Sequence, residues 1–402
     1  MAENKDKKVL NVPHLRFPEF CGEWEKTTLG KISEITKGSG ISKDQLSEQG
    51  SPCILYGELY TKYKSEIIDM VYSRTELDSS SLVKSKANDV IIPCSGETAI
   101  DISTARCIPF NNILLGGDLN IIRLKHDDGG FFAYQLNGAR KKDIARVAQG
   151  VSVVHLYGEN LKHIRVYHPA IEEQNKITRL LSLIDERIAT QNKIIEDLKK
   201  LKSAISKQVF AQEPNGWSRL DTLFSKGKAG GTPTSTNKEY YNGEIPFLSI
   251  NDITKQGKYV RYTENHLSQS GLESSSAWVV PKYSLIMSMY ASVGLVSINE
   301  IPITTSQAMF AMQLKDKDLL DYLYYYLSYF KYRHIHKYLE TGTQSNINAD
   351  IVRGIMIPTY GHSRNMEIAS TLQGIDVKID NELSVLKLFN RQKNYLLSQM
   401  FI

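Results

Sequence analysis

The strongest constraint on this chain is that it contains two long heptad segments of almost the same pattern. The first covers residues 171–211 and the second residues 362–402. In both, apolar residues recur at a 4-3-4-3 spacing, which is the a/d pattern of a coiled coil. Apolar positions of the first segment, such as Ile177 and Ile195, are matched 191 residues later by Ile368 and Leu386. The two segments are therefore copies of one helical unit, each long enough to need a partner for its apolar seam.

The apolar seam is interrupted at two equivalent places in each segment. These places hold Gln191 and Lys202 in the first segment, and Glu382 and Lys393 in the second. Two unrelated surface helices would rarely share such gaps at one offset. We predict that the helices pair antiparallel, with Lys202 opposite Glu382 and Gln191 opposite Lys393, because polar seam residues fix register and a buried lysine needs an acidic partner. The alternative is that these positions lie at a solvated edge of the helix pair, where the aliphatic part of each lysine packs along the surface and its ammonium remains in water.

The segments that precede the two helices are repeated as well. Trp24 is matched by Trp217, and the strand-like run Val90-Ile91-Ile92 is matched by Leu285-Ile286-Met287. We therefore expect four parts: a first globular domain (1–170), a first spacer helix (171–211), a second globular domain (212–361) and a second spacer helix (362–402). Each globular domain mixes short strands with a few helices and lacks regular β–α alternation, which predicts an α+β fold.

Composition permits several functions and excludes a few. The 402 residues carry 49 Lys and Arg against 44 Asp and Glu, a mildly basic balance that allows a nucleic-acid partner without requiring one. The four cysteines form no CxxC pair, so we expect a reducing cytoplasm and no zinc ribbon. The N-terminal stretch lacks the apolar core of a signal peptide, and no run of about 18 apolar residues predicts a membrane span.

Motifs for common enzymatic chemistry are missing from the sequence. There is no phosphate-binding GxxxxGK[ST] loop, no GxGxxG, HExxH or GxSxG string, and no Asn/Asp-Pro-Pro-Tyr/Phe motif of amino-methyltransferases. The histidines show no spacing typical of a metal site. We therefore predict a non-catalytic chain without a metal or cofactor of its own.

Loops in both globular domains combine basic, aromatic and polar side chains, as nucleic-acid interfaces do. Lysine and arginine neutralise phosphates, whereas polar side chains can recognise base edges. For any single lysine the alternative is a solvated surface charge, and for any single tyrosine it is core packing. The candidates in the first domain are Lys37, Ser39, Lys43, Tyr56, Glu58, Tyr60, Lys62, Ser95, Glu97 and Thr98. The candidates in the second are Lys228, Thr232, Thr234, Asn251, Lys255, Tyr259, Arg261, Tyr290, Ser292 and Gln344.

The candidates divide by expected role. Lys62 and Lys255 occupy equivalent positions of the repeat, so we expect both to contact DNA phosphates without regard to sequence. The polar loop residues are expected to contact bases, although such residues also cap turns.

With these features in place, the chain resembles the specificity subunit of type I restriction–modification systems. The most specific string is Gly230-Gly231-Thr232-Pro233-Thr234, followed by a stretch from Tyr240 to Ile253 similar to the family's YWNGDIPW…IxDI pattern. The joint of Pro169, Glu173 and Gln174 also resembles the family's entry into its long helix. The first domain has Lys37-Gly38-Ser39-Gly40 in place of GGTP, which suggests different loop structures in the two domains. The second joint has Arg364-Asn365 in place of Glu-Gln.

The resemblance implies a role in a larger complex. Each globular domain would recognise one half of a bipartite target in double-stranded DNA, and two methyltransferase subunits would bind this chain. An ATP-driven translocase/nuclease subunit joins the complex in restriction systems. S-adenosylmethionine, ATP and Mg²⁺ would belong to these partners, whose methyltransferase flips the target adenine out of the duplex.

Two other functions remain open from the residues alone. One is a two-headed DNA-binding regulator that works without a methyltransferase partner. The other is a coiled-coil scaffold for proteins, with no DNA function. A fused methyltransferase is disfavoured by the missing motifs.

Overall fold

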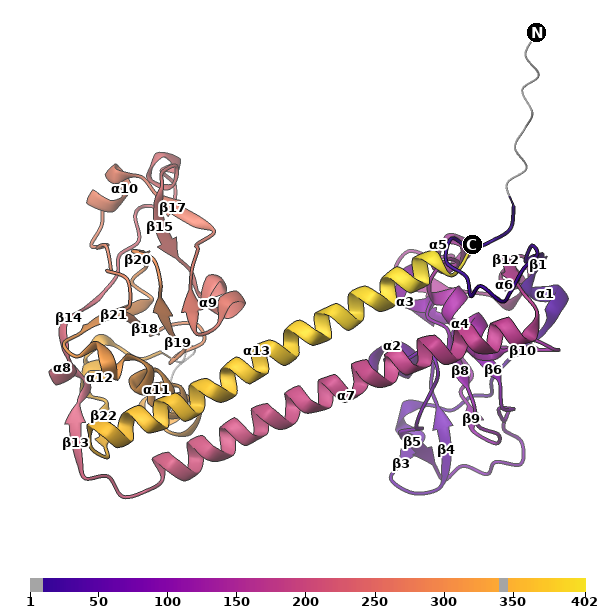
Figure 1. The fold of residues 1–402 in the computed structure, drawn as a ribbon, viewed down its shortest axis with the longest axis horizontal. Helices are drawn as coiled ribbons and strands as arrows, with labels where there is room; N and C mark the ends of the chain where they lie inside the picture. Colours follow the sequence, from indigo (N-terminus) through magenta and orange to yellow (C-terminus); the bar gives the residue numbers. More distant parts are fainter. Residues whose placement is uncertain (1–9, 340–345) are drawn as a thin grey trace, which may run out of the picture. The chain divides into compact units, whose positions relative to one another are not determined.

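The computed structural model describes residues 10–339 and 346–402, which form two compact units. Unit 1 consists of residues 1–193 with 384–402, and unit 2 consists of residues 194–383. Figure 1 shows that each unit contains one mixed globular part together with a portion of both long helices. The α+β fold with two globular domains and two long helices is thus confirmed. The candidate residue Gln344 lies outside the described residues.

Unit 1 is built around a four-stranded antiparallel sheet. Its strands, in spatial order, are β2 (Ser33–Lys37), β10 (Leu119–Leu124), β6 (Asp89–Pro93) and β8 (Arg106–Ile108). Strand β6 is buried along its whole length because both faces of the sheet are covered. Val90 and Ile92 face a core that includes helix α4 (Gly129–Asn137), whereas Ile91, on the opposite face, belongs to a second core.

The second core of unit 1 lies under a smaller sheet that positions a short helix. This sheet contains β3 (Leu46–Ser47), β5 (Ser73–Thr75), β4 (Ser51–Ile54) and β9 (Leu114–Leu115). Helix α2 (Glu58–Thr61) follows directly after β4 and buries Leu59 in the second core. Packing of Leu59 against this core fixes the orientation of α2 and of its exposed side.

Unit 2 repeats this architecture. The larger sheet has the order β14 (Phe224–Ala229), β21 (Met309–Leu314), β18 (Leu285–Ser288), β19 (Val296–Asn299) and β16 (Tyr259–Val260). The smaller sheet contains β17 (Asn265–Leu267), β15 (Ile245–Leu248) and β20 (Thr304–Thr305). Helix α9 (Ile250–Gln256) follows β15 as α2 follows β4, and α11 (Leu320–Arg333) takes the place of α4. Helices α2 and α9 are therefore equivalent elements.

The remaining short elements complete the two units. In unit 1 these are β1 (Glu25–Thr28), α1 (Leu29–Ile32), η1 (Lys43–Gln45), β7 (Ser95–Gly96), α3 (Ala99–Ile102), α5 (Lys141–Val147), β11 (Val154–His155), α6 (Gly158–Lys162) and β12 (Arg165–His168). In unit 2 they are β13 (Gly216–Arg219), α8 (Leu220–Leu223), η2 (Lys238–Tyr241), α10 (Gln269–Glu273), η3 (Lys317–Leu319), η4 (Ile335–Tyr338), α12 (Ala349–Gly354) and β22 (Met356–Thr359). No helix in the described part of the chain is long and apolar enough to cross a membrane.

The two long helices are α7 (Ile171–Phe210) and α13 (His362–Gln399), which begin at the residues where the heptad patterns begin. In unit 1 the start of α7 packs against the end of α13, through Ile177 and Leu396 in one core. In unit 2 the end of α7 packs against the start of α13, through Phe210 and Ile368. The helices are antiparallel in each unit, and their seams also complete the cores of the globular parts.

The predicted helix register is wrong. In unit 2 the Lys202 ammonium lies 2.5 Å from a carboxylate oxygen of Asp376, six residues before Glu382. Glu382 forms an ion pair with Lys378 on its own helix. In unit 1 Lys393 pairs with Asp185 at 2.6 Å rather than facing Gln191. The acidic partners flank the a/d seam, so a comparison of seam positions alone could not find them.

The joints between domain and helix are alike despite their different sequences. At the first joint the Gln174 side-chain amide donates to the carbonyl oxygen of Pro169, and its oxygen accepts from the backbone N–H of Asp128. At the second joint the Asn365 side-chain oxygen accepts from the backbone N–H of Tyr360. Both amide side chains are buried and bind the chain just before the helix. Although the second joint has Arg364-Asn365 in place of Glu-Gln, the Asn365 amide binds the backbone before the helix as the Gln174 amide does.

Candidate nucleic-acid interface

The first globular domain has a cavity of about 960 Å³ beside helix α2. Its walls come from the segment around η1, from α2 with the residues before it, and from the Gly116-Gly117-Asp118 turn. The backbone brings these three segments together because β4 pairs parallel with β9, which ends just before that turn. Five candidate residues gather here, namely Lys43, Tyr56, Glu58, Tyr60 and Lys62.

The charges on α2 are organised around a buried carboxylate. Glu58 is only 6% exposed and accepts hydrogen bonds from the Leu55 backbone N–H and from the Ser73 hydroxyl. The Lys62 ammonium donates to Glu58 at 2.6 Å and to the Ser73 hydroxyl at 2.8 Å, and its side chain remains about half exposed. Because the Glu58 carboxylate is already bound, it is suited to holding Lys62 in place rather than to recognising a base directly.

The other candidates in the first domain lie around this cavity or cap local structure. Ser39 accepts from the backbone N–H of Val83, and the Lys37 ammonium lies 5.9 Å from the ring centre of Tyr157. Thr98 is the N-cap of α3 and accepts from the backbone N–H of Asp101. Ser95 belongs to β7, which pairs with β11, and Glu97 is an exposed residue of the turn that follows. Thr98 therefore caps a helix, which was the alternative to base contact for such polar loop residues.

Tyr60 connects the cavity to the β7–α3 segment. Burial, together with the nearby Tyr56, Glu97 and Asp101, raises the pKa of the Tyr60 phenol, so it remains a neutral hydroxyl at physiological pH. A neutral hydroxyl can both donate and accept a hydrogen bond. The Tyr60 side chain is thus chemically suited to either a phosphate or a base edge.

In the second domain, several candidates are exposed side chains on α9, near the end of β14 and on the loop after β14. The Lys255 ammonium and the Asn251 amide both bind the carboxylate of Glu264, with the amide at 3.2 Å. Thr232 hydrogen-bonds the side chain of Gln307, and Thr234 is exposed on the same loop. Lys228 donates to the carbonyl oxygen of Ser276 at 3.2 Å. The sequence pattern did not single out Glu264 or Gln307, because neither lies at a recognisable spacing from its partner.

Tyr259 and Arg261 have contacts of their own, apart from those of Glu264 and Gln307. Arg261 forms an ion pair with Glu300 at 2.7 Å, and the Tyr259 hydroxyl donates to Asp321. Both residues line a cavity of about 230 Å³ together with Lys202 and Asp376 of the long helices. They therefore belong to the contact between the globular part of unit 2 and its helices.

The loops after β2 and β14 begin with the same backbone hydrogen bonds, although their sequences, KGSG and GGTP, differ. Gly38 donates to the Leu119 carbonyl oxygen, as Gly230 donates to that of Met309. A β-carbon on Gly38 would lie 2.0 Å from the carbonyl oxygen of Gly116, and one on Gly230 would lie 1.9 Å from that of Thr305. The first glycine is required in both loops by this close approach, and only the later residues differ.

The turn between β18 and β19 presents Tyr290 and Ser292. Ala291 and Ser292 both have positive φ, 38° and 56°, a conformation that is costly for residues other than glycine. The Ser288 hydroxyl holds the turn by donating to the Ser292 carbonyl oxygen at 2.7 Å. Tyr290 is 41% exposed at the tip of this strained turn. Among the described residues, no cluster of three or more His, Cys, Asp or Glu side chains could hold a metal ion.

The model of the type I restriction modification DNA specificity domain matches this chain twice, over residues 22–200 and 214–386. The chain belongs to this family. The two matches follow the repeat, since each covers one globular domain and a part of the helix after it.

Individual relatives agree with the family assignment. The chain is 27% identical over 158 residues to the MjaIX specificity subunit of Methanocaldococcus jannaschii, covering 38% of this chain and 36% of the relative. It is 26% identical over 282 residues to the putative MjaX specificity subunit of the same organism, covering 62% of each. The matched regions thus span about a third to three fifths of these relatives. The crystal structure of a type I S subunit from M. genitalium has the same fold, with a TM-score of 0.63, 16% identity, and coverage of 97% of this chain and 99% of that one.

Proposed function

We propose that this chain is the DNA-specificity subunit of a type I restriction–modification complex. In this proposal residues 1–170 and 212–361 are target-recognition domains, each recognising one half of a bipartite sequence in double-stranded DNA. The chain would itself be non-catalytic. Methyltransferase subunits would supply S-adenosylmethionine and the adenine chemistry, and translocase/nuclease subunits, where present, would use ATP and Mg²⁺.

The observation that carries this proposal is the equivalence of α2 and α9. Each helix follows an interior strand of a small sheet, β4 or β15, and each carries at its C-terminal end an exposed lysine, Lys62 or Lys255, that is held by a carboxylate of its own domain. Two copies of one arrangement, with different polar neighbours, suit a target made of two different half-sites. The family match over both copies supports the same interpretation.

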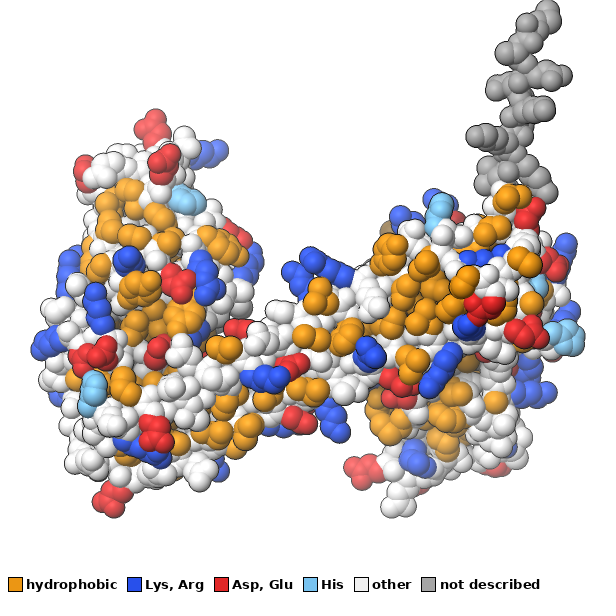
Figure 2. Space-filling view, in the orientation of Figure 1, with side chains coloured by type: hydrophobic (Ala, Val, Ile, Leu, Met, Phe, Trp, Pro, Cys, Tyr) orange, Lys and Arg blue, Asp and Glu red, His pale blue; other side chains and the backbone are white. Residues whose placement is uncertain are grey.

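The long helices offer a surface for protein partners. Several of their apolar side chains stay exposed within their own unit, including Leu183 and Leu388 in unit 1 and Leu201 and Val377 in unit 2. Figure 2 shows such apolar side chains interspersed with lysine and arginine along the surface of the molecule. Exposed apolar residues of this kind are typical of protein–protein interfaces. We propose that two methyltransferase subunits bind here.

Methylome sequencing provides the direct test. A host that expresses this chain with its methyltransferase partner should carry methyladenine in one bipartite sequence, and deletion of this chain should abolish that methylation. A two-headed regulator would instead bind DNA specifically without changing methylation. A protein scaffold would show no salt-dependent DNA affinity. Either result would overturn the proposal.

A further inference from the structure

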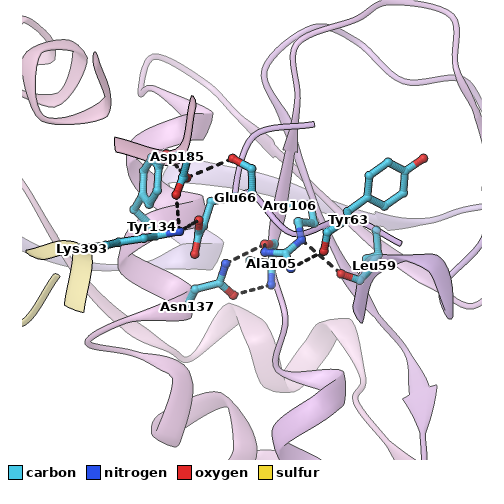
Figure 3. A network of polar contacts seen from close by, with 10 residues as sticks. Leu59, Tyr63, Glu66, Ala105, Arg106, Tyr134, Asn137, Asp185 and Lys393 are labelled. Atoms are coloured by element: carbon cyan, nitrogen blue, oxygen red, sulfur yellow. Dashed lines mark hydrogen bonds and ion pairs between the residues drawn. The ribbon is translucent and has the colours of Figure 1, made fainter. Parts of the chain in front are cut away.

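A buried polar network in unit 1 connects the globular part with both long helices, as Figure 3 shows. At its centre, the Lys393 ammonium from α13 lies 2.5 Å from a carboxylate oxygen of Glu66 and 2.6 Å from one of Asp185 on α7. The Tyr134 hydroxyl from α4 donates to Asp185 at 2.8 Å. The side chains of Lys393, Glu66 and Asp185 are 13%, 9% and 7% exposed, so solvent screens these charges weakly.

The same network extends to the candidate recognition helix α2. Arg106 is buried and donates to the carbonyl oxygens of Leu59 and Tyr63, at 3.2 and 2.9 Å, in and just after α2. Ser65, the residue before Glu66, donates to Asp185 at 3.0 Å. The short segment after α2 is therefore bound at its start by Arg106 and at its end by Lys393 and Asp185. This segment thus connects Lys393 with α2, which forms part of the cavity wall.

Unit 2 contains an equivalent network. Tyr325, Asp376 and Lys202 stand 191 positions from Tyr134, Asp185 and Lys393, and they form the same contacts. The Tyr325 hydroxyl donates to Asp376 at 2.8 Å, and Lys202 pairs with Asp376 at 2.5 Å. In each unit, a lysine of one long helix thus binds an aspartate of the other, and a tyrosine from the globular part binds that aspartate.

The connection to the recognition helix is also repeated, although its chemistry differs. Lys258 lies two residues after α9, and its counterpart in the repeat, Ser65, lies four residues after α2. Its ammonium donates to the Tyr325 hydroxyl at 3.1 Å and pairs with Asp321 of α11 at 2.7 Å. Lys258 is nearly buried, and burial lowers its pKa. In both units a residue two to four positions beyond the recognition helix therefore binds the tyrosine–aspartate pair.

Buried ionic networks add little net stability, because removing their charges from water costs free energy. Burial raises the pKa of the Glu66 carboxyl, which shows that the site disfavours its charged form despite Lys393 beside it. Buried ion pairs can often be replaced by apolar side chains without loss of stability, whereas their directional contacts fix geometry. The presence of such a network at equivalent places in both units favours a geometric role. Recognition requires that geometry, because a site must be held to within about 0.5 Å of its productive arrangement.

We propose that Lys393 with Glu66, and Lys202 with Lys258, are positioning residues that hold α2 and α9 for recognition of their own half-sites without contacting DNA. This inference rests on the proposed function. Because Lys393 is more buried than Lys202, 13% against 27% exposed, the effect of its loss is larger in the first domain.

The test measures the affinity of the complete complex with methyltransferase for three DNAs. These are the wild-type target, the target with one mismatch in the half recognised by residues 1–170, and the target with one mismatch in the other half. The informative variants are Lys393→Met, Lys202→Met and Glu66→Gln. The controls are Lys387→Met on α13 and Lys200→Met on α7, which replace exposed lysines of the same helices.

We expect Lys393→Met to reduce discrimination against the first-half mismatch by about 3- to 10-fold, a sizeable part of the roughly 5- to 150-fold cost of one mismatch. Discrimination in the second half should change by less than about twofold, within the range expected for independent sites. Lys202→Met should show the reverse pattern. Glu66→Gln should reproduce Lys393→Met, since it removes the charge of Glu66 that pairs with Lys393 while the Lys393–Asp185 pair between the helices remains.

Three outcomes would overturn the inference. If Lys393→Met weakens both halves equally, the network supports only folding or assembly. If Glu66→Gln behaves as wild type, Lys393 acts only between the helices. If Lys393→Met behaves as Lys387→Met, the network has no role in recognition. A failure of the proposed function itself is distinguishable, because the wild-type complex would then show no bipartite specificity.

Discussion

At the scale of single residues, Lys62 and Lys255 combine two properties that suit a phosphate contact. Each is about half exposed, and each is held by a carboxylate of its own domain, Glu58 or Glu264. An ammonium has three donors, and Lys62 uses two of them for Glu58 and Ser73. The third can reach a phosphate oxygen while the first two keep the side chain in place.

We predict that Lys62→Ala or Lys255→Ala weakens binding to every DNA sequence and lowers the slope of log affinity against log salt by up to about 0.9. The measurement is a salt titration with specific and nonspecific duplexes. Lys31→Ala, on α1 and outside the cavity walls, serves as the control. Salt slopes that stay unchanged in both variants would exclude the phosphate contacts.

His168 gives a prediction about pH. Its Nδ1 lies 2.9 Å from Asp127, and the hydrogen bond to Asp127 raises the pKa of His168 above its usual 6.5. Burial raises the pKa of Asp127, but hydrogen bonds from His168 and Gln174 outweigh it and leave that pKa lowered. Since the folded state binds the histidine proton more tightly, this contribution to stability is full below about pH 6.5 and is lost as pH rises through the folded pKa.

We therefore expect the melting temperature of the His168→Gln variant to fall further below that of wild type at about pH 6 than at about pH 9. Thermal unfolding followed at both pH values gives the comparison. His163→Gln, at the end of α6, is the control. A difference between variant and wild type that is the same at both pH values would show that the ion pair does not contribute to stability.

At the scale of elements, the loop after β2 depends on one close approach of two backbones. A β-carbon on Gly38 would lie 2.0 Å from the Gly116 carbonyl oxygen, whereas one on Gly40 would have nothing within 4 Å. The Gly116-Gly117 turn forms part of the cavity wall beside α2. The packing of these two loops therefore determines the shape of the candidate interface.

We predict that Gly38→Ala destabilises unit 1 by about 1–3 kcal/mol, as forced overpacking does, and weakens binding to the first half-site. Gly40→Ala, two residues away, should change stability by less than about 0.5 kcal/mol. Thermal unfolding and DNA binding of both variants provide the measurement. Equal effects of the two substitutions would contradict the close-approach argument.

The turn between β18 and β19 is a second element with a strained backbone. It keeps Tyr290 exposed through two residues with positive φ and a hydrogen bond from Ser288. We predict that Tyr290→Ala reduces discrimination in the second half-site by about 1–3 kcal/mol while leaving nonspecific affinity within about twofold. Tyr283→Ala, at another exposed tyrosine of the same unit, is the control. Retention of full specificity by Tyr290→Ala would exclude this turn from base recognition.

At the scale of the whole molecule, the repeat predicts that the two domains can be exchanged independently. Each globular domain has its own sheets and cores, and its helix α2 or α9 is connected to long-helix segments of its own unit. Exchange of residues 212–361 for the corresponding domain of another family member should change one half of the methylated sequence and leave the other half intact. Methylome sequencing of the chimera measures this. A simultaneous change in both halves would contradict the modular arrangement.

The long helices lead to a prediction about the spacer between half-sites. We expect an insertion of four residues in one helix to change the spacer length without altering either half-site, because about one helical turn is added between the domains. The same methylation assay detects this. An altered half-site would show that the insertion disturbs a recognition domain instead.

The repeat, both long helices and the α+β class could be predicted from the amino-acid sequence, because heptad spacing and internal similarity are local and periodic signals. The sequence also identified α2 and its neighbours as candidates, and their gathering at one cavity follows from the strand pairing beside them. The register of the two helices could not be predicted in this way, because it depends on contacts of the folded chain. Lys202 and Lys393 find Asp376 and Asp185 beside the seam, together with Tyr325 and Tyr134 from the globular parts. A buried lysine pairs with the carboxylate and hydroxyl groups that the complete fold places near it. Heptad periodicity cannot predict such partners when they come from outside the helices.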